Sequence, residues 1–413
     1  MLEKDFKVIM SKLAYLLVGI WGLVLGGSGC SWEQPQRENW CQQCGVYENK
    51  VVLGSSLALG GHAGYLGTQF LRGALAYFNE INGKGGVWKR KIEVIAYDDA
   101  YDPPKCLYNT QKLIVEDKVF SLFGYVGTPT TLKVLPFIEE ARIPLVGMFT
   151  GANALREPFN PWLINIRPSY YEETSKAIEH MVKDLGLTKI AIFYQYDAYG
   201  FDGLTGTELA LQHYQLTPVA RGSYIRGTLE VEDAFERIFS QEVEAVVLVG
   251  TYEPCSKFIR LATAQGKSPL FYAVSFVGAN ELARRIGDLK QTVIMSQVVP
   301  PPEFFPSTKE GYTSLLKKYY PEDEPNFVGL EGYVTARVMV EGLRRAGPTP
   351  TRKSLIAGIE SIKNLDLGQG LVLNFGPKDH QGLDKIYFTL LKDSKFRLIN
   401  NWSELLPDVK KNK

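Results

Sequence analysis

The sequence lacks an excess of charge of either sign. Its 413 residues carry 46 Lys and Arg against 45 Asp and Glu, which gives a formal net charge of +1. The small basic cluster at Lys89–Lys91 fits an ordinary solvated turn. A protein that binds nucleic acid needs a basic face, because binding neutralises phosphates. We therefore expect no nucleic acid partner.

Residue patterns of catalysis and metal binding are also missing. The sequence has 4 histidines, and their spacing matches no metal-binding motif. It contains no H-E-x-x-H, G-x-S-x-G or P-loop pattern, and no G-x-G-x-x-G opens the first expected helix. We therefore expect no catalytic residue, no metal and no cofactor.

One enzymatic alternative stays open, a hydrolase with Cys255 as its nucleophile. Cys255 follows an expected strand end and starts an expected helix, a position that lowers a thiol pKa. No base is identifiable beside it in the sequence. A buried structural thiol is the competing interpretation of the same residue.

The apolar run near the N-terminus, Leu13–Leu25, is shorter than the roughly 20 residues that cross a membrane. Lysines precede it and Gly26-Gly27-Ser28-Gly29-Cys30 follows it, as in a secretory signal. The cysteine after small residues resembles the lipoprotein box of bacteria, although Gly27 stands where that box usually has Leu. We predict a lipoprotein signal peptide at residues 1–29 and a lipid anchor at Cys30, in the periplasm or at the cell surface. The alternatives are an ordinary signal peptide and an uncleaved anchor.

Residues 30–50 are polar and predict a tether. They contain the pair Cys41 and Cys44, spaced as C-x-x-C. Because the pair precedes any expected strand and lies in an oxidising compartment, a structural disulfide is favoured over a redox motif. Cys106 and Cys255 have no assignable partners, so the pairing of these four cysteines stays open.

What the sequence does contain is an alternation of short apolar runs with amphipathic helical stretches, which restarts after about Arg167. This alternation predicts an α/β fold with two doubly wound parallel-sheet lobes. Almost wholly apolar runs such as Ala245–Val249 are typical of strands covered on both faces. Helices at 309–320 and 330–346 and a strand pair near 371–375 and 386–391 are expected to complete the lobes. The other expected strands are Val51–Leu53, Ile92–Tyr97, Val119–Phe123, Ile143–Val146, Lys189–Tyr194 and Leu270–Val274.

The loops that follow these strands are rich in Gly, Thr and Tyr. In an open parallel sheet, ligands bind beyond the carboxyl ends of the strands. Backbone N–H groups at a helix start and side-chain hydroxyls can donate hydrogen bonds to a carboxylate, and tyrosine rings can line a ligand-binding site. For Thr128 the alternative role is the N-cap of the helix that Pro129 starts. The candidate ligand-binding residues in these loops are Tyr65, Tyr125, Thr128, Phe149, Thr150, Gly151, Tyr199, Tyr252 and Phe276.

From Val51 to about Asn400 the chain resembles the leucine/isoleucine/valine-type solute-binding proteins of ABC importers. The segments that carry the resemblance are FLRGALAYFNEINGKGGVWKRKIEVIAYDDAYDP, LFGYVGTPTT, IPLVGMFTG, YQYDAYGFDG, VGTYEPC and LEGYVTARVMVEGLRRAG, in this order. The resemblance implies the type I periplasmic binding protein fold, with a three-segment hinge that crosses near Arg167, Pro301 and Gln381. It implies lobe 1 at residues 51–167 plus 302–381, lobe 2 at 168–301 plus 382–400, and a tail at 401–413.

The resemblance also implies a function: a monomer that captures a small molecule between closing lobes and delivers it to an ABC permease. By position, it places a ligand carboxylate near Thr128 and the turn at residues 149–151, and it adds Glu172 as a contact from the second lobe. A ligand-sensing binding protein that feeds a membrane receptor is the alternative function.

One departure from the family bears on the ligand. Members that bind amino acids offer an acid after the strand that ends here at Val274, to pair with the ligand ammonium, but this chain has Ser275-Phe276. Glu172 or Glu253 could substitute, and Arg167 could pair with a carboxylate or form a structural ion pair at the hinge. The expected ligand is therefore an amino acid or a small organic or aromatic carboxylate.

Overall fold

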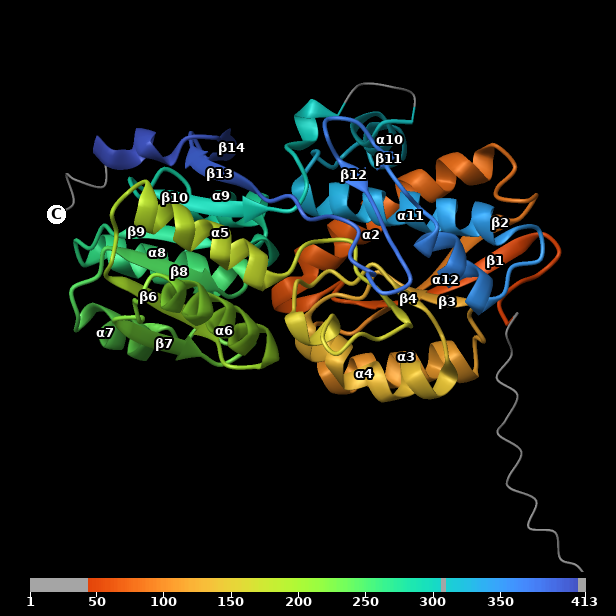
Figure 1. The fold of residues 1–413 in the computed structure, drawn as a ribbon, viewed down its shortest axis with the longest axis horizontal. Coiled ribbons are helices and arrows are strands. Elements are labelled where there is room, and N and C mark those ends of the chain that lie inside the picture. Colours follow the sequence, from red (N-terminus) through yellow and green to blue (C-terminus); the bar gives the residue numbers. More distant parts are fainter. Residues whose placement is uncertain (1–43, 306–309, 408–413) are drawn as a thin grey trace, which may run out of the picture. The chain divides into compact units, whose positions relative to one another are not determined.

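The structure is a computed structural model that describes residues 44–305 and 310–407 (Figure 1). Its strands form a five-stranded sheet, a seven-stranded sheet and a two-stranded sheet within these ranges. The two larger sheets, with the helices that pack on them, are named lobe 1 and lobe 2 below. The predicted signal peptide, Cys30 and Cys41 lie outside the described residues. Within the described ranges, no helix is both long and apolar enough to span a membrane.

Lobe 1 is built on a parallel sheet in the order β2-β1-β3-β4-β5. Helices α2 and α3 pack against α11 and α4, respectively, and Figure 1 shows these two pairs on opposite faces of the sheet. The sheet strands are β1 (Lys50–Leu57), β2 (Lys91–Asp98), β3 (Ser121–Phe123), β4 (Leu145–Val146) and β5 (Leu163–Ile164). The helices are α2 (Gly64–Gly83), α3 (Pro103–Val115), α4 (Thr128–Ala141), α10 (Tyr312–Tyr319), α11 (Phe327–Ala346) and α12 (Arg352–Glu360).

Lobe 2 has a mixed sheet in the order β14-β13-β10-β9-β8-β6-β7. The strands from β6 to β10 run parallel, whereas β13 and β14 add an antiparallel edge. The strands are β6 (Ile190–Gln195), β7 (Ala220–Tyr224), β8 (Ala245–Val249), β9 (Leu270–Ala273), β10 (Val293–Gln297), β13 (Tyr387–Lys392) and β14 (Lys395–Ile399). The helices are α5 (Tyr170–Lys183), α6 (Ala198–His213), α7 (Glu232–Phe239), α8 (Tyr252–Ala264) and α9 (Ala279–Ile286).

The chain passes between the lobes after β5, after β10 and before β13. The first and third crossings are hydrogen-bonded to each other. The N–H of Asn165 donates to the carbonyl of His380 at 2.8 Å, and the N–H of Gly382 donates to the carbonyl of Asn165 at 2.9 Å. The two sheets and the three crossings confirm the predicted fold class, two doubly wound lobes joined by a three-segment hinge.

Three local predictions need correction. Strands are present near the expected ranges 371–375 and 386–391, but they do not pair with each other: β12 (Val372–Leu373) pairs with β11 (Leu365–Asp366), whereas β13 pairs with β10 and β14. Apolar runs predict strands but not their partners. The end of the predicted tether belongs to lobe 1, where the carbonyl of Gly45 accepts from the N–H of Val52 at 2.8 Å. The predicted tail begins with a packed segment, since Trp402 is 1% exposed and its ring lies 5.0 Å from that of Phe388.

Candidate functional site

Side chains that follow strand ends of both sheets meet in one aromatic cluster. Its central residue is Phe276, in the short helix η3 (Ser275–Val277) of lobe 2. The Phe276 ring centroid lies 4.6 Å from Tyr199, 5.5 Å from Phe149 and 5.9 Å from Tyr101. All four side chains are 0% exposed. Because Phe149 and Tyr101 belong to lobe 1, the cluster joins the two lobes.

A second contact between the lobes pairs Tyr65, at the start of α2, with Tyr252, at the start of α8. Their ring centroids are 6.2 Å apart and nearly perpendicular, at 88°. Burial raises the pKa of Tyr252 to about 12, so its hydroxyl stays protonated. The guanidinium of Arg285 lies 5.1 Å from the Tyr252 centroid and covers that ring from the lobe 2 side.

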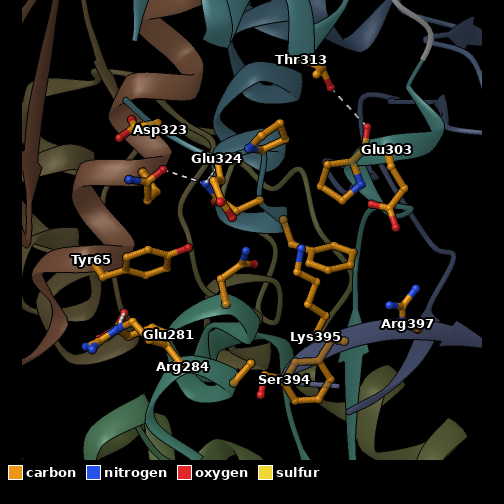
Figure 2. A pocket seen from close by; sticks show the side chains of 18 of the residues that line it. Tyr65, Glu281, Arg284, Glu303, Thr313, Asp323, Glu324, Ser394, Lys395 and Arg397 are labelled. Atoms are coloured by element: carbon orange, nitrogen blue, oxygen red, sulfur yellow. Dashed lines mark hydrogen bonds and ion pairs between the residues drawn. The ribbon is translucent and has the colours of Figure 1, made fainter. Parts of the chain in front are cut away.

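Beside Tyr65 a cavity of about 1080 Å³ opens between residues of the two lobes (Figure 2). Its lobe 2 side carries the basic residues Arg284, Lys395 and Arg397, together with one acid, Glu281, which pairs with Arg284 at 2.5 Å, so this side is basic on balance. Its lobe 1 side is acidic and includes Glu303, Glu322, Asp323 and Glu324. The two walls are therefore complementary in charge, and the cavity gives solvent access to the half-buried Tyr65.

Two threonine hydroxyls lie together at the start of α4. Thr128 Oγ1 and Thr150 Oγ1 are 2.7 Å apart, and both side chains are buried. The interpretation of Thr128 as the N-cap is wrong: Gly127 occupies that position, with φ 96°, and α4 begins at Thr128. A Cβ atom at Gly127 would overlap the ring of Tyr101, so only glycine fits both the backbone angle and the space.

Two predicted residues point elsewhere. The hydroxyl of Tyr125 lies 2.8 Å from Thr110 Oγ1 on α3, which turns this side chain into lobe 1. Glu172 completes the capping box of α5: its carboxylate accepts from the N–H and the hydroxyl of Ser169, each at 2.7 Å. Gln381 Nε2 donates to the same carboxylate at 3.1 Å. Glu172 therefore lies at the hinge, and the structure does not bring it into the aromatic cluster.

A buried charged group underlies the cluster and is called the hinge triad here: Arg167, Glu173 and Glu331. Arg167 is 1% exposed, Glu173 0% and Glu331 6%. Arg167 Nη2 lies 3.5 Å from Glu173 Oε1, and Arg167 Nε lies 3.7 Å from Glu331 Oε2. The guanidinium lies 4.8 Å from the ring centroid of Phe149. The triad therefore links the first crossing with α5 of lobe 2 and α11 of lobe 1.

Burial and the mutual charges of the triad shift the pKa values of Glu331 and Arg167. Burial raises the pKa of Glu331 to about 7, although the charge of Arg167 opposes the shift. For Arg167, burial lowers the pKa, but the carboxylates of Glu331 and Glu173 raise it by more, so the net shift is upward. The guanidinium therefore stays charged, whereas Glu331 is partly protonated near neutral pH.

Glu173 is the residue that the sequence reasoning missed. It supplies the carboxylate beside Phe276, since it accepts from the N–H and the hydroxyl of Ser275, each at 2.8 Å. Ser296 Oγ donates to it at 2.5 Å. Glu253, the other expected substitute, instead pairs with Arg285 at 2.5 Å.

The thiol considered as a nucleophile is buried. Cys255 is 0% exposed on α8, and burial raises its pKa above the ordinary value. A neutral thiol is a poor nucleophile. Among the described residues, no group of His, Cys, Asp and Glu could hold a metal ion.

Comparisons with known proteins identify the family and agree with the fold. A family model described as periplasmic binding protein matches residues 50–395. The chain is 37% identical to a possible leucine/isoleucine/valine-binding protein from Rhodopirellula baltica, whose crystal structure superposes with a TM-score of 0.82 over 87% of this chain and 98% of that one. It is 24% identical to the Leu/Ile/Val-binding protein homolog 7 of Brucella suis, over 71% of this chain and 77% of that protein. It is 23% identical to an amino acid binding protein of Pseudomonas aeruginosa, over 57% of this chain and 63% of that protein.

Proposed function

Because the chain belongs to the periplasmic binding protein family, whose members bind solutes and are not enzymes, we propose that it captures a small polar molecule between its two lobes. The observation that carries the proposal is the aromatic cluster, in which Phe149 of lobe 1 lies 5.5 Å from Phe276 of lobe 2. A ligand held there contacts both lobes only when they are closed. Binding therefore shifts the population toward the closed form.

The proposed ligand is an amino acid or a small organic or aromatic carboxylate. The hydroxyls of Thr128 and Thr150 are buried polar groups at the N-terminus of α4, an end that favours an anion. Phe149, Tyr199 and Phe276 provide aromatic surface for an apolar body. The relatives from Pseudomonas and Brucella carry names that refer to amino acids, which fits the same class.

The proposed partner is an ABC permease in the membrane, to which the closed monomer presents the surfaces of both lobes. The resemblance to the leucine/isoleucine/valine type supports this partner. We further propose that Cys30 carries a lipid anchor and that the protein works in the periplasm or at the cell surface. Mass spectrometry of the exported chain tests the anchor, because lipidation adds acyl mass to Cys30 and Cys30→Ala abolishes the addition.

A thermal-shift screen of the full chain tests ligand capture. The panel contains branched-chain and aromatic amino acids, their oxo acids, aromatic carboxylates, short amides and urea. A ligand that binds only the native state raises the melting temperature by mass action. Small-angle scattering with each hit then measures closure. Unchanged dimensions at saturating ligand would rule out closure of the lobes on the ligand.

A matched pair of variants tests the position of the site. Thr128→Val removes a buried hydroxyl and keeps the shape, so the affinity should fall about 10-fold. Thr205→Val is the control, because the Thr205 hydroxyl is exposed on α6 and donates to the carbonyl of Phe201. Equal affinities of the two variants would place the ligand elsewhere.

A further inference from the structure

The guanidinium of Arg167 has unused hydrogen-bonding capacity in a buried place. Among the residues that the structure describes, neither Nε nor Nη1 of Arg167 has a hydrogen-bond partner, although the side chain is 1% exposed. Nη2 is engaged by Ser275 Oγ, and Nε faces Glu331 at 3.7 Å, beyond hydrogen-bond reach. Buried N–H groups are nearly always paired, because an unpaired donor loses its hydration without compensation. Nη1, which carries two N–H groups, is therefore suited to an acceptor that enters the site.

This guanidinium belongs to the candidate site. It lies against the rings of Phe149 and Tyr170, at 4.8 Å and 5.9 Å from their centroids. Phe149 contacts Phe276, and Tyr170 lies 5.3 Å from Tyr199. A ligand among these rings thus has the Arg167 guanidinium beside it, whose charge is shared with Glu173 and Glu331 and whose Nη1 still has free N–H donors within the described part of the chain.

The acid nearest to Phe276 has no capacity left for a ligand ammonium. A carboxylate offers about four lone-pair positions. Glu173 uses three for the Ser275 N–H, the Ser275 hydroxyl and the Ser296 hydroxyl, and it faces Arg167 Nη2 with the same oxygen that binds the Ser275 hydroxyl. An ammonium would have to displace one of these partners.

The other acids around the cluster are engaged as well. Asp99 accepts from the hydroxyl of Ser56 and from the N–H of Tyr101. Asp197 accepts from the amide of Gln195 and from the N–H of Tyr199. Glu331, the last member of the hinge triad, accepts no hydrogen bond from Arg167, but its charge is compensated by the ion pair with the guanidinium at 3.7 Å. A buried ammonium without a counter-charge is strongly unfavourable.

We propose that the site selects a carboxylate without an α-ammonium group, with Arg167 Nη1 as the anchor of the carboxylate and with Phe149 and Phe276 against its apolar body. The proposal rests on the proposed function and names its ligand class. Oxo acids and aryl- or alkyl-substituted carboxylic acids belong to this class. A fixed guanidinium favours the carboxylate in any of them, because hydrogen bonds between ionised groups are the stronger ones.

Calorimetry with the unaltered full chain is the primary test, since it depends on no variant that has to fold. The ligands form matched series: phenylalanine, hydrocinnamate, phenylpyruvate and hydrocinnamamide, and leucine, isocaproate and ketoisocaproate. We expect at least one acid without the ammonium to bind about 10-fold or more tightly than its matched amino acid and, in the phenylalanine series, than hydrocinnamamide. An amino acid that binds as tightly as its matched acids overturns the ligand class, while closure around that amino acid still supports the proposed function.

Failure of every compound in the series to bind also overturns the ligand class. The thermal-shift screen with the wider panel, followed by small-angle scattering with each hit, then tests the proposed function separately, because it asks whether the lobes close on any ligand. Arg167→Gln gives the second readout: it should weaken the acid 10- to 100-fold and the amide by clearly less, because the neutral carbonyl makes the weaker bond, whereas a purely structural role for Arg167 would affect both equally. Equal weakening of acid and amide would contradict the role of Arg167 as the carboxylate anchor.

Discussion

The carboxylate of Asp202 accepts a hydrogen bond from the backbone N–H of Asn153, with its two oxygens at 3.0 Å and 3.1 Å from the nitrogen. Asp202 lies on α6 of lobe 2, and Asn153 begins the short helix η2 (Asn153–Leu155) of lobe 1. The bond therefore spans the two lobes. Burial raises the pKa of Asp202 to about 6, and the N–H of Asn153 opposes this shift because it stabilises the charged form. Separation of the lobes would break this bond.

We expect Asp202→Ala to weaken ligand binding about 10-fold, through faster dissociation, because a charged hydrogen bond of the closed form is lost. Stopped-flow measurement of association and dissociation with a ligand from the screen checks this. The control is Glu208→Ala, which removes an ion pair with Arg221 inside lobe 2. If the two variants dissociate at the same rate, the bond between Asp202 and Asn153 does not hold the lobes together.

The pKa of Glu331 predicts a loss of stability as the pH rises. The value is about 7 in the folded protein, against 4.5 for the ordinary group. The folded state therefore holds the proton more tightly, and this contribution is complete below the unfolded pKa and lost as the pH passes the folded one. The shift corresponds to roughly 3 kcal/mol of unfolding free energy. We expect Glu331→Gln to remove this part of the pH dependence and to be more stable than the unaltered chain above neutral pH.

Urea denaturation of both proteins at several pH values between about 5 and 8 measures the difference. The comparison is needed because Asp99 and Asp202 also have raised pKa values, each about 6, and contribute equally to both proteins. Parallel stability curves for the two proteins would show that Glu331 does not titrate in this range.

Two glycines with the same backbone angle allow the cost of backbone strain to be measured separately from the cost of steric overlap. Gly127 and Gly85 both have φ 96°. A Cβ at Gly127 overlaps the ring of Tyr101, whereas one at Gly85 meets nothing within 4 Å. Both Gly→Ala variants should lose about 1–2 kcal/mol through the backbone angle. Gly127→Ala should lose further stability and also bind ligand more weakly, because Tyr101 moves out of the aromatic cluster. Denaturation measures the loss of stability of each variant, and calorimetry measures its ligand affinity. Equal losses of stability and affinity in Gly127→Ala and Gly85→Ala would contradict the prediction.

The fold class was predictable because parallel strands buried on both faces are nearly all apolar. The expected strand Ala245–Val249 matches β8 at both ends. Strand β7 escaped detection because its sequence, ARGSY, alternates buried and exposed positions and contains few apolar residues. The strand pairing in the C-terminal part could not be predicted, because a crossing between the lobes separates β12 from β13.

The aromatic cluster was predictable in part, because the loops after parallel strands meet at one edge of a sheet. Phe149, Tyr199 and Phe276 of this cluster were named in this way, whereas Tyr101 was missed because it joins the cluster only through the contact between the two lobes. For Glu172 a local signal was present. The segment Ser169-Tyr170-Tyr171-Glu172 has the S-x-x-E pattern of a capping box, which assigns Glu172 to the start of α5. That assignment would have directed attention to Glu173 as the acid beside Phe276.

Cys255 should prove chemically inert in the native protein, because its thiol is fully buried and burial raises its pKa. Both effects keep the thiolate, the reactive form, at a low population. We therefore expect iodoacetamide to label Cys255 only when the chain opens, and labelling in urea should be faster by orders of magnitude. Cys255→Ala should retain ligand affinity and lose about 1 kcal/mol of stability. Rapid labelling of Cys255 in the native chain, read by mass spectrometry, together with lost function in Cys255→Ala, would instead support a nucleophilic role for this residue.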